Sequence, residues 1–209
     1  MTCTICILAP FLLLTGSHNL LNYAIICLVN KKIEITTNTR NIPQNWAFSG
    51  KKEQTITMIK VLFICHGNIC RSTMAEFVFK DMVSKKGLSD VFEIASAATS
   101  REEIGNPVHP GTKRILDGLG ISCKGKTAIQ TTRRDYDYYD YIVGMDSWNM
   151  RNMSKIYGGD PDNKLYKLLE FAGKSDDVAD PWYTGNFDVT YRDVKAGCEG
   201  LLKQIMDRM

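Results

Sequence analysis

Hydrophobic and polar positions follow two different spacings from residue 58 to the end of the chain. Short apolar runs at residues 61–64, 92–97, 140–145 and 164–169 predict four strands. Between these runs, apolar residues recur every three to four positions, which predicts helices. Strands that alternate with helices are typical of an α/β fold with a parallel sheet.

The expected helices have recognisable ends. The first starts near Ser72 and stops at Gly87, and the second opens at Pro110 and ends at Gly120. Asp146 is a good N-cap for a third helix. The last helix has one apolar face, formed by Val194, Cys198, Leu201, Leu202 and Ile205.

The segment before residue 58 has a different pattern. Residues 2–30 contain no charged side chain, and their apolar runs at 5–14 and 20–29 are separated by a polar break. A secretory signal would need positive charge before its apolar run, and a membrane span needs about 20 predominantly apolar residues. Met58 directly precedes the first strand and is suited to be the natural start.

We therefore favour an N-terminal extension over residues 1–57, disordered or lying upstream of the true start, ahead of a catalytic domain over residues 58–209. A membrane anchor over residues 5–29 is the alternative. Residues 33–57 are polar and lack periodicity, so we expect a linker there.

Composition and charge limit the number of domains and the classes of partner to be expected. The chain has 209 residues, 44% of them hydrophobic, which suits one domain with an appendage. The net charge of +3 comes from residues 1–57, because the remainder has 21 basic and 21 acidic residues. A neutral domain gives no electrostatic reason to expect a nucleic-acid partner.

A possible anion site lies between the first strand and the first helix. A loop that opens with Cys65 and closes with Arg71 joins them. Backbone N–H groups and the positive end of the helix dipole favour an oxyanion at such a junction, and Arg71 adds a planar fork of donors. The same features stabilise a thiolate, which makes Cys65 a nucleophile beneath a bound phosphate.

The loop resembles that of a known family. Its Cys-x-Gly-Asn-x-Cys-Arg-Ser pattern is similar to the phosphate loop of the low-molecular-weight protein tyrosine phosphatases, and the resemblance extends over nearly all of residues 58–209. A Walker-type nucleotide loop does not fit, because no Gly-Lys-Ser/Thr ends the turn. The pattern consists of Cys65, His66, Gly67, Asn68, Ile69, Cys70, Arg71 and Ser72.

The resemblance implies a fold and a set of roles. The fold is a Rossmann-like three-layer sandwich, with a twisted four-stranded parallel sheet between helices. Residues 66–70 and Ser72 would bind substrate around Cys65 and Arg71. Ser72 would also donate a hydrogen bond to the thiolate. Asn68 would occupy a strained loop position and, together with Ser96, would order the loop.

A second resemblance lies after the last expected strand. Asp180-Pro181-Trp182-Tyr183 is similar to the family's Asp-Pro-aromatic-aromatic segment, whose Asp is the general acid. Expelling an ester oxygen requires a proton donor opposite the nucleophile, which a carboxyl group can supply. Trp182 and Tyr183 would then form walls around a flat substrate.

The sequence also departs from the family pattern. Thr73 replaces the usual proline, which affects the helix start more than the chemistry. Leu119 stands where vertebrate members have a loop-ordering histidine, so we expect a smaller network. Glu102 and Glu103 replace an aromatic and an amide on one wall. His66 is expected to point away from the anion.

Cysteine usage indicates a reducing environment. The seven cysteines are irregularly spaced and one is needed as a thiolate, so we expect a cytoplasmic protein without a disulfide framework. Cys65 and Cys70 lack a second pair of ligands and the three histidines are scattered. We therefore expect neither a metal nor another cofactor.

The leading interpretation is a phosphotyrosine protein phosphatase that acts on a phosphotyrosine protein or a small aryl phosphate. In this interpretation Cys65 forms a cysteinyl-phosphate intermediate and Asp180 is the general acid. Alternatives are a thioredoxin-coupled arsenate reductase, a protein-arginine phosphatase and a non-catalytic phosphopeptide-binding module. The reductase would need two further relay cysteines, whereas its equivalent region contains only Cys123.

Overall fold

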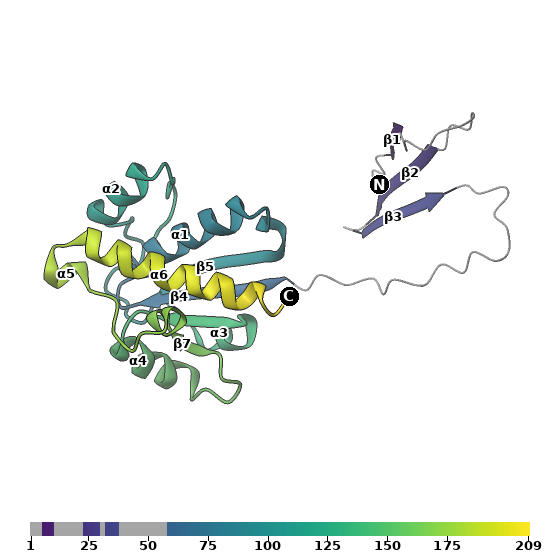
Figure 1. The fold of residues 1–209 in the computed structure, drawn as a ribbon. Helices are drawn as coiled ribbons and strands as arrows, with labels where there is room; N and C mark the ends of the chain where they lie inside the picture. Colours follow the sequence, from purple (N-terminus) through teal and green to yellow (C-terminus); the bar gives the residue numbers. More distant parts are fainter. Residues whose placement is uncertain (1–5, 11–22, 30–31, 38–57) are drawn as a thin grey trace. The chain divides into compact units, whose positions relative to one another are not determined.

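Strand β4 (Ile59–Cys65) is an inner strand of a four-stranded sheet in the computed structural model (Figure 1). The order is β5-β4-β6-β7, with β5 at Phe92–Ala98, β6 at Tyr141–Gly144 and β7 at Leu165–Lys167. Every pair is parallel. The predicted parallel α/β sheet is confirmed.

The structure describes residues 6–10, 23–29, 32–37 and 58–209. The chain divides into two units, Met1–Gln54 and Thr55–Met209. In the first unit, β1 (Cys6–Pro10), β2 (Tyr23–Val29) and β3 (Lys32–Thr37) form an antiparallel sheet. Strand β3 covers the beginning of the stretch that the sequence predicts to be a linker. The rest of that linker lies outside the described residues.

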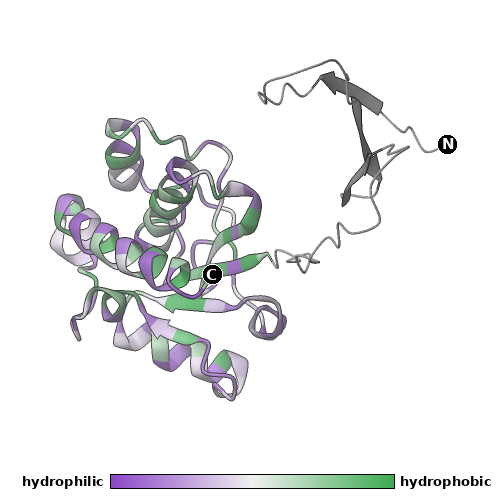
Figure 2. Ribbon diagram, turned by 45° about the vertical axis from the view of Figure 1, so that its right-hand side comes forward, coloured by the Kyte–Doolittle hydropathy of each residue, from purple (hydrophilic) through white to green (hydrophobic). Residues whose placement is uncertain are grey.

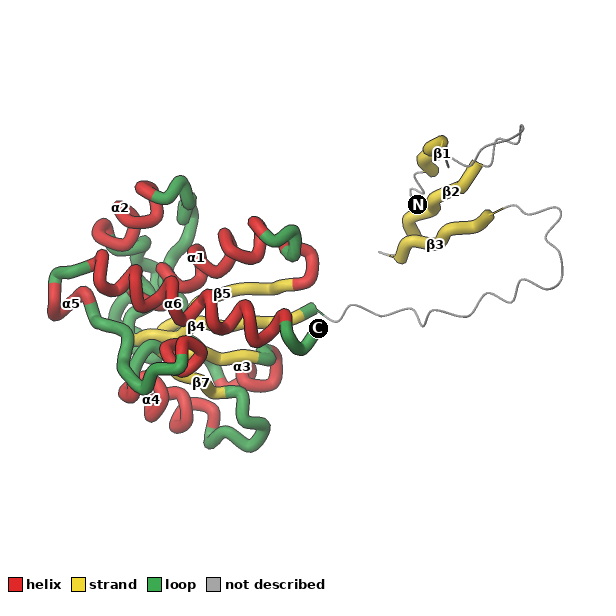
Figure 3. The backbone as a smooth tube through the Cα atoms, viewed as in Figure 1, coloured by secondary structure: helices red, strands yellow, loops and turns green. Residues whose placement is uncertain are grey.

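Helices cover both faces of the larger sheet (Figures 1 and 3). Helices α1 (Arg71–Lys85) and α6 (Phe187–Met206) pack on one face, beside α2 (Pro110–Gly118). On the other face lie α3 (Arg133–Tyr138) and α4 (Ser147–Tyr157). The three-layer sandwich implied by the family resemblance is therefore confirmed.

The alternation along β4 explains this layering. Val61 and Phe63 belong to the core cluster beneath α1 and α6, whereas Leu62 and Ile64 belong to the cluster beneath α3 and α4. Successive side chains of a strand point to opposite faces, so a strand buried on both sides needs a continuous apolar run. Figure 2 shows this concentration of hydrophobic residues on the central strands.

Some elements differ from the sequence prediction. The fourth strand ends at Lys167, and a 3₁₀ helix, η2 (Leu168–Ala172), follows it. Leu168 and Leu169 are consecutive yet buried in the same cluster, which an extended strand does not permit. Three short elements are not predicted from the sequence: α3, α5 (Pro181–Thr184) and the 3₁₀ turn η1 (Ser89–Val91).

Parallel strands bring their carboxyl ends to one edge of the sheet. The chain enters β4 near the C terminus, and α5 lies at the opposite end of the domain (Figure 1). Ligands of open α/β sheets bind beyond the carboxyl ends of the strands. Within the described ranges, no helix has the length and apolar character needed to cross a bilayer.

Candidate active site

A pocket of about 520 Å³ opens beyond the carboxyl end of β4. Segments from five parts of the domain form its walls: the loop after β4, the start of α1, the turn after β5, the start of α4 and α5. Its lining residues are Cys65, His66, Gly67, Ile69, Cys70, Arg71, Glu102, Glu103, Asp146, Trp148, Asn149, Asn152, Asp180, Trp182 and Tyr183.

Cys65 is the last residue of β4 and forms part of the pocket floor. The strand pairs with neighbours on both sides, and Cys65 itself is opposite Ala98 of β5. The Sγ atom lies 3.0 Å from Ser72 Oγ, and Asn68 N donates to it over 3.3 Å. The thiol is therefore held by a strand below and by two polar groups from the loop and α1.

The hydrogen bonds around Asn68 determine which way Ser72 donates. The backbone N–H of Ile129 donates to Asn68 Oδ1 over 3.1 Å, so the amide nitrogen of Asn68 is the donor on its other side. That nitrogen donates to Ser72 Oγ over 2.9 Å. The hydroxyl hydrogen of Ser72 is then free to point at Cys65, which accepts it.

The backbone at Asn68 is in the left-handed region, with φ 58°. Asn tolerates this conformation better than most residues. Thr73 Oγ1 donates to the carbonyl oxygen of Asn68 over 2.8 Å, so the residue that replaces the family proline also holds the loop.

Arg71 is the first residue of α1, and its guanidinium joins two carboxylates. Nη1 lies 2.5 Å from Asp146 Oδ2, and Nη2 lies 2.5 Å from Asp180 Oδ2. Burial lowers the pKa of Arg71, but Cys65, Asp180 and Asp146 raise it by more, so the net shift is upward. The guanidinium therefore remains a cation inside the pocket.

Asp146 has two functions at the start of α4. Its Oδ1 accepts from Asn149 N over 2.6 Å, which confirms the predicted N-cap. Its Oδ2 orients Arg71, a contact that is not predicted from the sequence. A cap already explains an Asp before a helix, so the sequence carried no sign of the second function.

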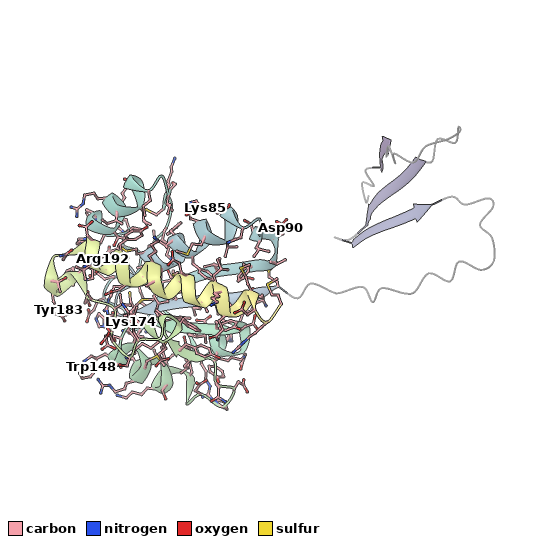
Figure 4. The ribbon with its side chains drawn as sticks, viewed as in Figure 1. Lys85, Asp90, Trp148, Lys174, Tyr183 and Arg192 are labelled. Carbon is pink, nitrogen blue, oxygen red and sulfur yellow. The ribbon has the colours of Figure 1, made fainter. Side chains whose placement is uncertain are left out.

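Asp180 precedes α5 and caps it through Trp182 N, at 3.0 Å. Trp182 and Tyr183 extend from this short helix as exposed aromatic side chains on the pocket wall. Figure 4 labels Tyr183 together with Trp148, another exposed aromatic residue of the lining. The carboxyl group of Asp180 and two of the aromatic side chains thus come from one short segment, and α4 adds Trp148.

A further wall is acidic. His66 and Glu102 both line the pocket, and His66 Nε2 lies 2.9 Å from Glu102 Oε2. Glu103 approaches the loop closely, because a Cβ added at Gly67 would lie 3.0 Å from Glu103 Cγ. Gly67 therefore leaves room for this wall beside the nucleophile.

Cys70 is buried at the base of the loop, and the described cysteines Cys65, Cys70, Cys123 and Cys198 are free. Burial, reinforced by the charges of Cys65 and Asp180, raises the pKa of the Cys70 thiol to about 12. Cys70 is thus a neutral thiol beside the candidate nucleophile.

Three expected site residues lie behind the pocket. The side chains of Asn68, Ser72 and Ser96 are buried and do not line it. Asn68 Nδ2 donates to Ser96 Oγ over 2.7 Å, which is the loop-ordering contact that the resemblance implies. The side chains of Asn68 and Ser72 therefore support the loop, although both residues were expected to bind substrate.

The supporting network extends beyond Asn68 and Ser96. Leu119 is exposed and contributes nothing to it. Instead, Ser96 Oγ donates to Glu76 Oε2 over 2.5 Å, and Lys126 Nζ lies 3.1 Å from the same oxygen. Lys126 thus joins the network from a distant part of the chain.

The described part of the chain contains no group of three or more His, Cys, Asp or Glu side chains arranged to hold a metal ion.

Comparison with known proteins places this geometry in context. The family described as low molecular weight phosphotyrosine protein phosphatase matches residues 60–209. The chain is 45% identical over 150 residues to the low molecular weight protein-tyrosine-phosphatase YfkJ of Bacillus subtilis (strain 168), covering 71% of this chain and 96% of that protein.

Solved structures agree with the sequence comparison. The crystal structure of YfkJ from Bacillus subtilis has a TM-score of 0.71 at 44% identity, covering 73% of this chain and 97% of that one. SP-PTP from Streptococcus pyogenes, titled a low molecular weight protein tyrosine phosphatase, has a TM-score of 0.64 at 44% identity, with 70% and 93% covered. A drosophila arginine phosphatase has a TM-score of 0.65 at 25% identity, with 70% and 98% covered.

Proposed function

The chain belongs to the low molecular weight phosphotyrosine protein phosphatase family and is a protein-tyrosine phosphatase, and we propose that it works through a cysteinyl-phosphate intermediate on Cys65. One observation carries this proposal. The Cys65 sulfur accepts hydrogen bonds from Ser72 and from the backbone of Asn68, directly beside the Arg71 cation. This environment stabilises a nucleophilic thiolate next to an anion site.

In the first step, the thiolate of Cys65 attacks phosphorus and the bond from phosphorus to the ester oxygen breaks. Asp180 gives its proton to the departing phenolic oxygen, which leaves as a neutral phenol. The Arg71 fork binds two oxygens of the phosphoryl group, and N–H groups of the loop and of the first turn of α1 complete the cradle. The phosphoryl group is then attached to sulfur.

In the second step, water attacks phosphorus and the bond to sulfur breaks. The Asp180 carboxylate takes a proton from that water, so the acid returns to its starting form. Ser72 donates to the departing thiolate, as it does in the structure. The products are inorganic phosphate and the free Cys65 thiolate, and no metal or cofactor takes part.

The binding roles follow the pocket. His66, Gly67, Ile69 and Cys70 surround the phosphate, with Asn68 and Ser72 supporting the loop from behind. Trp182 and Tyr183 hold the flat ring of a phosphotyrosine side chain or a small aryl phosphate.

The proposal also covers the domain organisation and the cellular compartment. Residues 58–209 form the catalytic domain, and residues 1–57 are not needed for the chemistry. A thiolate nucleophile and a neutral Cys70 thiol suit a reducing compartment, so we assign the enzyme to the cytoplasm.

The decisive experiment measures phosphate release from an aryl phosphate, with and without arsenate plus thioredoxin. We expect phosphate release from the wild type and none from Cys65→Ser, which should still bind phosphate. Thioredoxin oxidation that depends on arsenate, without phosphate release, would favour an arsenate reductase. Phosphate binding without turnover in the wild type would favour a phosphopeptide-binding module.

A further inference from the structure

We propose that Lys126 is a positioning residue for Cys65 and that its charge keeps the phosphate loop ordered from behind. This inference rests on the proposed function, in which Cys65 is the nucleophile. Lys126 does not line the pocket and touches neither Cys65 nor Arg71. It acts through the hydrogen bonds that reach Asn68.

Lys126 is a largely buried cation that is both paired and hydrogen-bonded. Its side chain is only 12% exposed. Nζ donates to the carbonyl oxygen of Ser96 over 2.9 Å and lies 3.1 Å from Glu76 Oε2. A buried ammonium group is costly unless it is paired and hydrogen-bonded, and both requirements are met here.

The first route to the nucleophile passes through Glu76. Ser96 Oγ donates to Glu76 Oε2 over 2.5 Å, so Ser96 presents its lone pairs to Asn68 Nδ2, 2.7 Å away. The other hydrogen of that amide goes to Ser72 Oγ, which in turn donates to Cys65. Lys126 Nζ pairs with the same Glu76 oxygen that accepts from Ser96, and so holds this acceptor in place.

The second route passes through the backbone. Lys126 begins the short segment that ends at Gln130 and runs beside the end of β5, where Ala98 N donates to the carbonyl oxygen of Ile129 over 2.7 Å. The N–H of Ile129 is the group that fixes the amide of Asn68. By bonding to Ser96 in the same strand, Lys126 anchors the beginning of this segment.

Both routes meet at Asn68, the residue with the left-handed backbone. A residue in that region holds its conformation only when its surroundings determine it. Removal of Lys126 would loosen the side-chain route and the backbone route together. The loop would then order less often around an anion, and Cys65 would lose part of the support for its thiolate.

The test compares Lys126→Met with Lys80→Met. Lys80 is a matched control, because its Nζ lies 2.5 Å from the other oxygen of Glu76 but its side chain is 43% exposed and makes no hydrogen bond to Ser96. Two quantities are measured in the full chain: kcat/KM for an aryl phosphate, and the rate at which iodoacetamide alkylates Cys65 between pH 5 and pH 9.

For Lys126→Met we expect on the order of tenfold lower kcat/KM and alkylation that requires a higher pH, because a charge-assisted hydrogen bond behind the loop is lost. Lys80→Met should stay within about twofold of the wild type, because an exposed pair contributes little. Lys126→Arg should restore most of the activity, since it keeps the charge and the donors.

Thermal unfolding separates this role from a purely structural one. Lys126→Met will lower the melting temperature, so both measurements are made well below its midpoint. A folded Lys126→Met with wild-type kcat/KM and a wild-type alkylation profile overturns the proposal. An equal loss in Lys80→Met also overturns it. A wild type without aryl phosphatase activity would instead refute the proposed function, a separate result.

Discussion

Nη2 of Arg71 lies 2.5 Å from Oδ2 of Asp180, so the cation assigned to phosphate and the carboxyl group assigned to the leaving group are in contact. Arg71 begins α1 and Asp180 caps α5, 109 positions later in the chain. A bound phosphate would compete with Asp180 for the guanidinium. Binding of phosphate would therefore release Asp180 toward the ester oxygen that it protonates.

The leaving group should decide how much Asp180 matters. We expect Asp180→Asn to slow hydrolysis of phenyl phosphate by about 10²–10³, within the usual contribution of general acids, and hydrolysis of p-nitrophenyl phosphate far less. Nitrophenolate leaves without a proton, whereas phenolate does not. Asparagine still caps α5, so the fold should be kept. The measurement is kcat/KM across a series of aryl phosphates, because this quantity reports the step in which the leaving group departs. Equal losses throughout would show that Asp180 does not protonate the leaving group.

Mutation should separate the two functions of Asp146, which caps α4 and orients Arg71. Asp146→Asn keeps a good N-cap for α4 but removes the ion pair with Arg71, so we expect kcat/KM to fall by about tenfold or more with an almost unchanged melting temperature. Asp146→Ala should lose both, with about 1 kcal/mol less stability from the missing cap. Kinetics and thermal unfolding of the two variants provide the comparison. Wild-type kcat/KM in Asp146→Asn would show that Arg71 needs no such partner.

Phosphotyrosine should be preferred over phosphoarginine. In the protein-arginine phosphatases that resemble this family, a threonine occupies the position of Ile69. Here Ile69 lines the pocket without offering a hydroxyl group, and Trp182 and Tyr183 favour a flat ring. We expect a higher kcat/KM for phosphotyrosine when the two phosphoamino acids compete in one assay. Faster turnover of phosphoarginine would reverse the substrate assignment.

Cys70 should protect Cys65 from irreversible oxidation. Peroxide reacts with thiolates, and burial raises the pKa of Cys70 to about 12, so Cys70 remains a neutral thiol below that pH and Cys65 is oxidised first. Oxidised Cys65, as sulfenic acid, can condense with the Cys70 thiol to form a disulfide and water. Oxidation of Cys65 also removes its negative charge, which helps to raise the pKa of the Cys70 thiol.

The measurement is the activity recovered after peroxide followed by a thiol reductant. Wild type should recover and Cys70→Ser should not, whereas Cys123→Ser is a matched control at another buried, free cysteine and should recover like the wild type. Equal recovery in all three proteins would remove Cys70 from this role.

The first 57 residues should be dispensable for catalysis. A shortened chain that begins at Met58 contains the whole sheet of β4 to β7 and every residue of the pocket. We expect its kcat/KM for an aryl phosphate to lie within about twofold of the full chain. A large loss of activity, or insolubility of the shortened chain, would show that the fold needs the N-terminal segment.

Local patterns were sufficient to predict the sheet and much of the site. The apolar runs predict the inner strands β4 and β6 because these are buried on both faces. The loop from Cys65 to Arg71 can be recognised because its functional residues are contiguous in the sequence. Helix α3 also carried a local signal that was overlooked. Thr132 N donates to Asp135 side-chain oxygen over 2.6 Å, part of a capping box spaced as Thr-x-x-Asp.

Other parts of the site have no local signal in the sequence. Lys126 stands two positions after Lys124, and only the fold distinguishes them, because one is largely buried against Glu76 while the other is exposed. Glu76 lies within the first expected helix, where an acidic residue is ordinarily solvated. Contacts between residues far apart in the chain depend on how helices and strands pack together. The spacing of apolar residues does not predict that packing.

The inner position of β4 has a consequence for how the enzyme would fail. Amides of a strand with partners on both sides exchange with solvent only when most of the domain opens, whereas a four-residue helix such as α5 can unfold alone. Cys65 is the last residue of β4, whereas Asp180 directly precedes α5. Mild heat or denaturant would thus displace the proton donor Asp180 before the nucleophile Cys65. The partly unfolded enzyme would still cleave nitrophenyl phosphate but would already have lost its activity toward phosphate esters of ordinary phenols.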